Sequence, residues 1–121
     1  MRLFALRGAI SVERNDAADI HAATSTLMRE IMQRNGLHPQ DVVSCIFTVT
    51  KDLNAEFPAA AARSLGFEEV PLLCAQEIGV PGAMPRVIRV LLHYHAAEDH
   101  RATHVYLGDA RALREDLAAA Q

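Results

Sequence analysis

One long amphipathic helix constrains this chain more than any other feature of its sequence. Apolar side chains recur at helical spacing at Ile20, Ala23, Leu27, Met28 and Ile31. Asn15 or Asp16 is a suitable N-cap, and Asn35-Gly36 has the residue types that end a helix. A helix with one apolar stripe must bury it against another element, and the β-rich runs nearby indicate a sheet.

Short β-rich or apolar runs before and after this helix predict the strands. They cover residues 3–6, 42–50, 70–74, 87–95 and 104–107, and we expect the first to end at Arg7. A short second helix is expected over residues 59–65, because Pro58 suits a first turn and Gly66 an end. The order β-α-β-α-β-β, followed by the last short strand, predicts an α+β fold, a mixed β-sheet with both helices on one face.

Length and composition limit the kinds of protein that this chain can be. With 121 residues, 50% of them hydrophobic, we expect one domain, residues 1–121, with a flexible tail from about residue 111. The sheet face that the helices do not cover must also be buried, and in so small a chain this favours packing against copies of itself in a symmetric oligomer. A net charge of -3 with scattered basic residues argues against nucleic acid as a partner.

Targeting signals and cysteines indicate the compartment. The N-terminal apolar stretch is interrupted by Arg2 and Arg7, which does not fit a signal peptide, and no apolar run is of membrane-spanning length. Cys45 and Cys74 lie in unrelated contexts without a disulfide framework. We therefore expect a cytoplasmic protein with reduced thiols and no membrane partner.

Several cations, one carboxylate and one phenol stand out as candidate site residues. They are Arg7, Arg63, Glu77, Arg89 and Tyr106, with Phe57 and Cys74 near them in sequence. No nucleophile is paired with a general base in this set, so it suits the binding of a small polyanion better than covalent catalysis. Each residue also has an ordinary interpretation: a solvated strand edge or ion pair for an arginine, a surface carboxylate for Glu77, and a core position for Phe57.

A pair of histidines allows a different interpretation. His93 and His95 would share one face of a strand, where two imidazoles could bind zinc. His100 and His104 follow, but their spacing matches no strong metal pattern. We expect no metal and no other cofactor.

Strings spread over residues 7–117 resemble one enzyme family. They are Arg-Gly-Ala-Ile at 7–10, Val-Glu-Arg at 12–14, Phe-Thr-Val-Thr at 47–50, Phe-Pro-Ala at 57–59, Val-Pro at 70–71, Gln-Glu at 76–77, Arg-Val-Ile-Arg-Val at 86–90 and His-Val-Tyr-Leu at 104–107. The family is that of the monofunctional chorismate mutases of the AroH class, which form trimers of pseudo-α/β-barrel shape. The resemblance implies an isomerase of aromatic amino-acid biosynthesis that rearranges chorismate to prephenate without a cofactor.

The resemblance also implies a homotrimer with each active site in a cleft between adjacent subunits. Arg7, Arg89 and Tyr106 would hold the enolpyruvyl carboxylate, and Arg89 would also reach the ether oxygen. Glu77 and Cys74 would bind the ring hydroxyl. The remaining substrate-binding positions would be Phe57, Ala59, Leu72, Leu73 and Leu113 in the pocket and Arg63 and Arg114 near its mouth.

Two positions depart from what the family can have. Ala60 stands where some members have a lysine near the entrance, so substrate capture would depend more on Arg63 and Arg114. Leu73 stands where a threonine can occur, which matters little if that residue contributes only its backbone. A non-enzymatic trimeric module that binds a small carboxylate remains the alternative, since the same arginines would bind an anion without accelerating a reaction.

Overall fold

Helix α1, Ala17–Asn35, forms where the apolar periodicity predicts it in the computed structural model of the chain, which describes residues 1–113. Asp16 caps its start by accepting a hydrogen bond from the Asp19 N–H at 3.1 Å. Gly36 ends it with a φ of 63°, a left-handed conformation that costs glycine little. The apolar stripe is fully buried at Ile20, Leu27, Met28 and Ile31.

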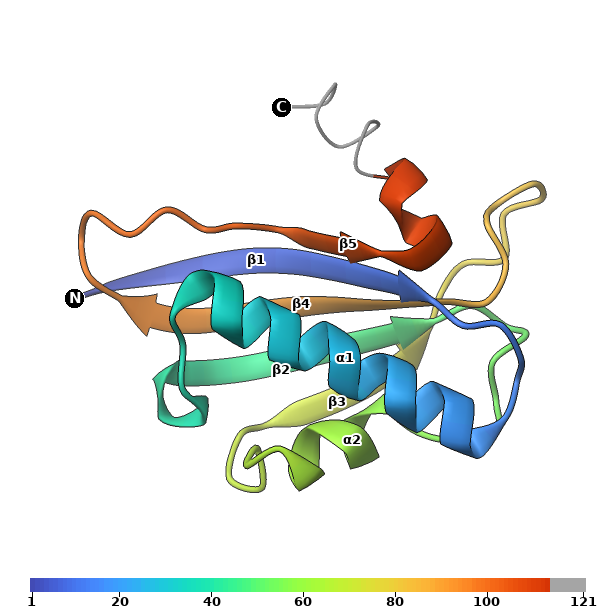
Figure 1. Ribbon diagram of the computed structural model, residues 1–121, viewed down its shortest axis with the longest axis horizontal. Coiled ribbons are helices and arrows are strands. Elements are labelled where there is room, and N and C mark those ends of the chain that lie inside the picture. Colours follow the sequence, from blue (N-terminus) through green and yellow to red (C-terminus); the bar gives the residue numbers. More distant parts are fainter. Residues whose placement is uncertain (114–121) are drawn as a thin grey trace.

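Five strands form one mixed sheet in the order β3-β2-β4-β1-β5, and both helices cover one of its faces (Figure 1). The bounds are β1 Arg2–Ser11, β2 Val42–Val49, β3 Leu72–Gln76, β4 Val87–Ala96 and β5 Val105–Leu107. Strand β4 is antiparallel to β1 and β2, whereas β3 and β5 pair in parallel with β2 and β1. The second helix, α2, spans Pro58–Ser64 and starts at its proline. The predicted α+β fold is confirmed.

The first strand differs from its prediction. We expected it to end at Arg7, but its pairing with β4 continues as far as Ser11 opposite Val87. Gly8 and Ala9 do not end the strand, because β4 on one side and β5 on the other pair with their backbones. Arg7 therefore lies in the middle of a central strand rather than at the end of the sheet.

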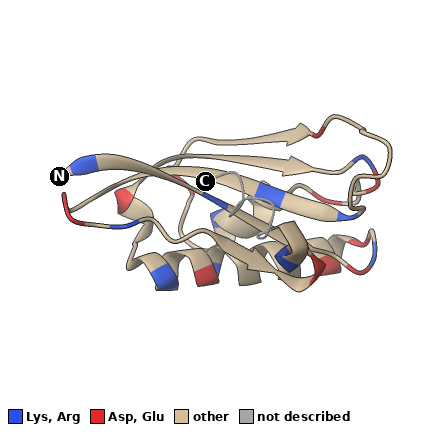
Figure 2. Cartoon of the chain, turned by 90° about the horizontal axis from the view of Figure 1, so that it is seen from above, with Lys and Arg blue, Asp and Glu red and all other residues tan. Residues whose placement is uncertain are grey.

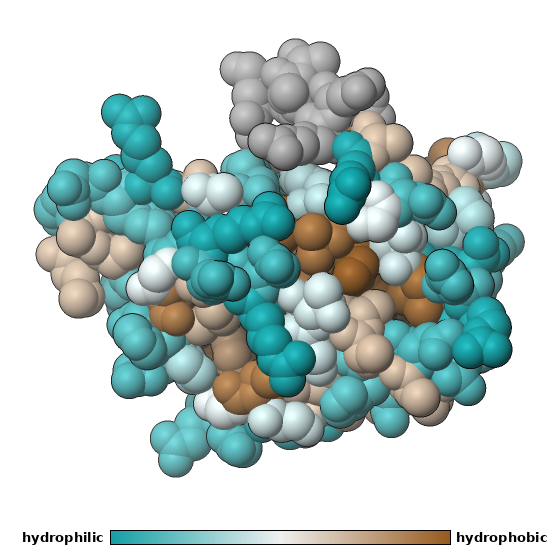
Figure 3. Space-filling model, in the orientation of Figure 1, coloured by the Kyte–Doolittle hydropathy of each residue, from teal (hydrophilic) through white to brown (hydrophobic). Residues whose placement is uncertain are grey.

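Alternate strand residues form the main core beneath α1. Leu6, Phe47 and Leu92 face the helix and are at most 1% exposed. Gly8 allows the helix to approach closely, because a Cβ there would lie 2.8 Å from Ile31 Cδ1. The outside of this helical face is mostly hydrophilic, with small separate apolar areas (Figure 3).

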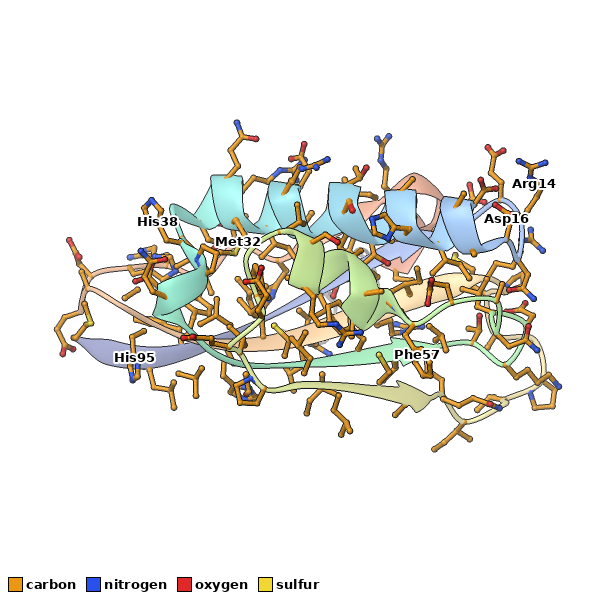
Figure 4. The ribbon with its side chains drawn as sticks, turned by 90° about the horizontal axis from the view of Figure 1, so that it is seen from below. Arg14, Asp16, Met32, His38, Phe57 and His95 are labelled. Carbon is orange, nitrogen blue, oxygen red and sulfur yellow. The ribbon has the colours of Figure 1, made fainter. Side chains whose placement is uncertain are left out.

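The other face of the sheet carries the second set of alternating side chains. Figure 4 shows α1 and α2 on one side of the sheet, with His95 projecting from the other. A small separate cluster of Ala9, Val87 and Ala110 joins the sheet to η2, Gly108–Arg111. The predicted tail lies largely beyond this helix, in residues 114–121, outside the part of the chain that is described. None of the helices in residues 1–113 is long and apolar enough to cross a membrane.

Candidate active site

A cavity on the sheet face away from the helices contains three of the predicted site residues. It has a volume of about 270 Å³. Its polar lining comes from Arg7, Thr48, Arg89 and Tyr106, and its apolar lining includes Ile46 and Leu91. The side chains come from four strands, so the sheet itself assembles the site.

The register of the sheet explains how these residues meet. Thr48 pairs with Arg89, Arg89 with Ala9, and Ala9 with Tyr106. Directly paired residues point to the same face, so the four side chains form one row across β2, β4, β1 and β5. Ala9 is the small member of this row, which leaves room between the arginine and the phenol. Arg7 belongs to the next row on the same face, two residues along β1.

Glu77, directly after β3, does not itself line the cavity, but two side chains that line it bind its carboxylate. Arg89 Nε lies 3.2 and 3.0 Å from its two carboxylate oxygens, and the Thr48 hydroxyl donates to Oε2 at 2.8 Å. The Glu77 backbone N–H also donates to the Val49 carbonyl at 2.9 Å. The Glu77 side chain is 19% exposed and that of Arg89 40%, so water only partly screens the ion pair.

The ion pair determines which part of Arg89 faces the cavity. Glu77 engages Nε, and within residues 1–113 no hydrogen bond or ion pair uses the two Nη groups. A guanidinium held at Nε keeps its terminal donors in a fixed plane for an anionic ligand. Basic and acidic residues are interspersed over the rest of the molecule without a stripe of one sign (Figure 2). The cationic character of the cavity is therefore local.

Two other predicted residues lie at a different cavity, beside the end of β3. This second cavity has a volume of about 340 Å³ and is lined by Phe57 and Cys74, with Glu56, Pro58 and Gln76 among their neighbours. Phe57 lies near the sheet end toward which β2 and β3 point, opposite the end with His95 (Figure 4). Its side chain is 66% exposed. Within one chain, then, neither Phe57 nor Cys74 lines the first cavity, which is named the arginine cavity after Arg7 and Arg89.

The remaining predicted residues that the structure describes line neither cavity. Ala59 is buried at the start of α2, and Arg63 is exposed in its last turn. Leu72 packs toward the main core, whereas Leu73 is 61% exposed on the other face of β3. Leu113 packs against the Ala9 cluster together with Tyr106, next to the first cavity. Arg114 lies outside the described residues.

The other groups raised by the sequence have separate surroundings. Burial raises the pKa of the Cys45 thiol to about 12, so the thiol is neutral, and it lines neither cavity. His93 lies 3.5 Å from the Ser44 hydroxyl, and His95 is exposed. In the described part of the chain, no group of three or more His, Cys, Asp or Glu residues is arranged to hold a metal.

Comparison with known proteins identifies the family of the chain. The sequence model of the family "Chorismate mutase type I" matches residues 3–117. The chain is 47% identical over 118 residues to the chorismate mutase AroH of Thermus thermophilus, covering 96% of this chain and 97% of that protein. The chain belongs to the chorismate mutase type I family.

Two further chorismate mutases support the assignment. AroH of Bacillus subtilis (strain 168) is 38% identical over 120 residues, which cover 98% of this chain and 94% of that protein. The solved structure of a chorismate mutase from Clostridium thermocellum superimposes with a TM-score of 0.87 at 45% identity. That match covers 90% of this chain and 98% of the other.

In this chorismate mutase two side chains that contact the site residues were not predicted from the sequence. Thr48 lines the arginine cavity and donates to Glu77. His104 accepts a hydrogen bond from the Arg7 backbone. The two-residue alternation of β2 indicated that Thr48 shares a face with Ile46, but the partner of its hydroxyl depends on the pairing of β2 with β3. For His104, the residue type and its spacing from His93 and His95 suggested only a metal ligand, and its contact with Arg7 depends on the register of β5 on β1.

Proposed function

We propose that the chain converts chorismate to prephenate by binding its substrate in the arginine cavity. The observation that carries this proposal is the row of Thr48, Arg89 and Tyr106 beside Arg7, with Glu77 held at its edge. In the proposed roles, Arg7, Arg89 and Tyr106 bind the enolpyruvyl carboxylate. Arg89 also reaches the ether oxygen through its Nη groups.

The chemistry of the rearrangement fits such a site. A carbon–oxygen bond breaks while a carbon–carbon bond forms in the same molecule, so no acid, base or nucleophile is required. An enzyme accelerates the step by selecting the compact conformer and by stabilising the charge that develops on the ether oxygen. Arginine suits the second task, because it keeps its charge near neutral pH and Glu77 restricts its position.

Typical free-energy contributions indicate how the rate acceleration is divided among the site residues. A millionfold acceleration needs about 8 kcal/mol. Loss of one preorganised donor to developing charge costs on the order of 3 kcal/mol. Arg89 could therefore supply a large part of the acceleration but not all of it, and we assign the rest to conformer selection by Arg7, Tyr106 and the apolar walls.

The second cavity supports a site shared between subunits. Phe57 and Cys74 line a separate cavity in one chain, and Phe57 exposes an apolar ring. We propose a homotrimer in which these residues, with Ala59, Leu72, Leu73 and Arg63, meet the arginine cavity of a neighbouring copy. Leu113 and Arg114 would close the same cleft. Cys74 would join Glu77 in binding the ring hydroxyl.

The assay with chorismate tests the proposed activity directly. Purified protein is mixed with chorismate, loss of its ultraviolet absorbance is followed, and the product is identified by its conversion to phenylpyruvate in acid. We expect turnover without added metal or cofactor. A folded oligomer that binds chorismate and leaves it unchanged would favour the non-enzymatic carboxylate-binding alternative. We also propose the cytoplasm as the location, since Cys45 and Cys74 are both free thiols.

A further inference from the structure

The backbone of Arg7 is bonded to a side chain from the neighbouring strand. Its N–H donates to His104 Nδ1 at 3.0 Å. Gly8 pairs with Val105 and Ala9 with Tyr106, so one step earlier in the same register His104 stands opposite Arg7. An imidazole nitrogen therefore serves as the acceptor for an N–H within the β1–β5 ladder.

The position of His104 is fixed in turn by a buried amide at the end of α1. The Asn35 side chain donates to the Thr103 carbonyl at 2.9 Å and accepts from the Thr103 N–H at 2.8 Å. It also donates to the Ile31 carbonyl at 2.9 Å, and Asn35 is only 7% exposed. Both backbone groups of the residue before His104 are thus tied to α1, which leaves the ring little freedom to move away from Arg7.

The hydrogen bond requires an unprotonated Nδ1, and the surroundings favour that state. Burial lowers the pKa of the His104 imidazole, and the charge of Arg7 on β1 lowers it further. From α1 the ring is supported through the uncharged Asn35, and within β5 the nearest titratable group is the Tyr106 phenol. The acceptor is therefore present near neutral pH and is lost when the pH falls through the lowered pKa.

We propose that His104 is a positioning residue for Arg7. Its hydrogen bond fixes the Arg7 backbone in the position from which the guanidinium reaches the substrate carboxylate in the arginine cavity. The proposal rests on the proposed function, because it gives Arg7 a substrate to bind. It adds a link from α1 through Thr103 and His104 to the site.

Three substitutions at position 104 separate this role from simple strand packing. In His104→Asn, the amide oxygen lies close to the position of Nδ1 and does not titrate. His104→Gln places its polar atoms one bond farther from the backbone, and His104→Ala removes the acceptor. His21→Ala, in α1 and away from both cavities, is the matched histidine control, and Arg7→Ala is the reference for loss of the arginine.

We expect the Ala and Gln variants to lose about tenfold or more in kcat/KM, and the Asn variant and the His21→Ala control to stay within about twofold of the original chain. The original chain should lose activity below the ordinary histidine pKa of about 6.5, and the Asn variant should lack that part of the pH profile. Full activity in His104→Ala, or the same acid loss in His104→Asn, would overturn the proposal.

Two further readouts keep the result interpretable. If His104→Ala does not fold, the comparison of Asn with Gln decides, because both keep a polar side chain. The amide proton of Arg7, followed by NMR, should shift as His104 titrates, and an amide that does not respond would overturn the proposed contact. If Arg7→Ala keeps full activity, the proposed function of the cavity fails. If only the Arg7 variant loses activity, the role of His104 fails alone.

Discussion

At the scale of single residues, Arg89 and its two neighbours form the chemical centre of the proposed site. Glu77 binds Nε and Thr48 binds Glu77, so the guanidinium is positioned by a residue of β2 and by the residue that follows β3. A positioned charge needs little reorganisation when charge develops on the substrate. Arg63, in contrast, is exposed at the end of α2, and its guanidinium has no hydrogen-bonding partner in the described part of the chain.

This difference predicts opposite kinetic effects for two arginines. Arg89→Ala should lower kcat by a factor of roughly one hundred or more, because it removes charge stabilisation that acts in the transition state. Arg63→Ala should mainly raise KM, because it removes attraction for the substrate near the mouth. Steady-state kinetics on both variants give the test, and the same split between kcat and KM in both would contradict the assignment.

For a substitution of Thr48 we predict a loss of kcat that is smaller than for Arg89→Ala. Thr48→Val keeps the shape of the side chain and removes the hydroxyl that donates to Glu77, a charge-assisted bond worth about 1.5–3 kcal/mol. We expect roughly a tenfold loss in kcat, since Arg89 would then be positioned less well. Thr48→Ser keeps the hydroxyl and is the control. Equal rates for the Val and Ser variants would show that the bond has no part in catalysis.

Residue types singled out Arg7, Arg89 and Tyr106 only as candidates, and the family resemblance assigned them to one site, where one cavity does bring them together. Residue types did not predict Thr48 or His104. The partner of the Thr48 hydroxyl follows from the pairing of β2 with β3, and that of His104 from the register of β5 on β1. Register depends on contacts between distant segments, which local patterns do not specify.

At the scale of elements, α1 packs closely on β1 at Gly8, in the segment of the strand that lines the arginine cavity. Gly8 lies between Arg7 and Ala9, and a Cβ there would meet Ile31 Cδ1 at 2.8 Å and the Val105 carbonyl oxygen at 3.2 Å. Leu27 Cδ1 would lie 3.3 Å away on the same side. Three separate contacts therefore leave no space for a side chain where the helix crosses the strand.

Gly8→Ala should destabilise the fold by about 1–3 kcal/mol, because α1 or β5 must move to accept the methyl group. Urea unfolding followed by circular dichroism measures the change. Gly79→Ala is the matched control, since its nearest contact, Lys51 Cδ, would be 3.7 Å away. The explanation fails if the two variants are equally stable.

Element positions were predictable to different degrees. Both ends of α1 were predicted, because Asp16 and Gly36 act locally as caps. The end of β1 was not, because Gly8 suggested a break while β4 and β5 extend the strand from both sides. Strand β3 begins at Leu72 rather than at residue 70, because Pro71 has no N–H to donate to the sheet. Several other ends of helices and strands also differ from their predicted positions by one or two residues.

At the scale of the whole molecule, the proposed site is divided between two regions of the chain. Arg7, Arg89 and Tyr106 line one cavity, whereas Phe57 and Cys74 line another. The sequence resemblance predicted residues from two subunits, and the separation of the cavities supports that prediction. The trimer itself stays a prediction, since it depends on contacts between copies.

Mixing two defective variants tests the shared cleft most directly. Arg89→Ala disables the arginine cavity, and Phe57→Asp places a negative charge in the other half, at a position that is 66% exposed in one chain. After joint unfolding and refolding, an equal mixture should recover about a quarter of the original activity, because that fraction of trimer interfaces unites two intact halves. A mixture of Arg89→Ala with Arg7→Ala, both defective in the same half, should recover none. If the first mixture is no more active than the second, each site is complete within one chain and the shared-cleft account is wrong.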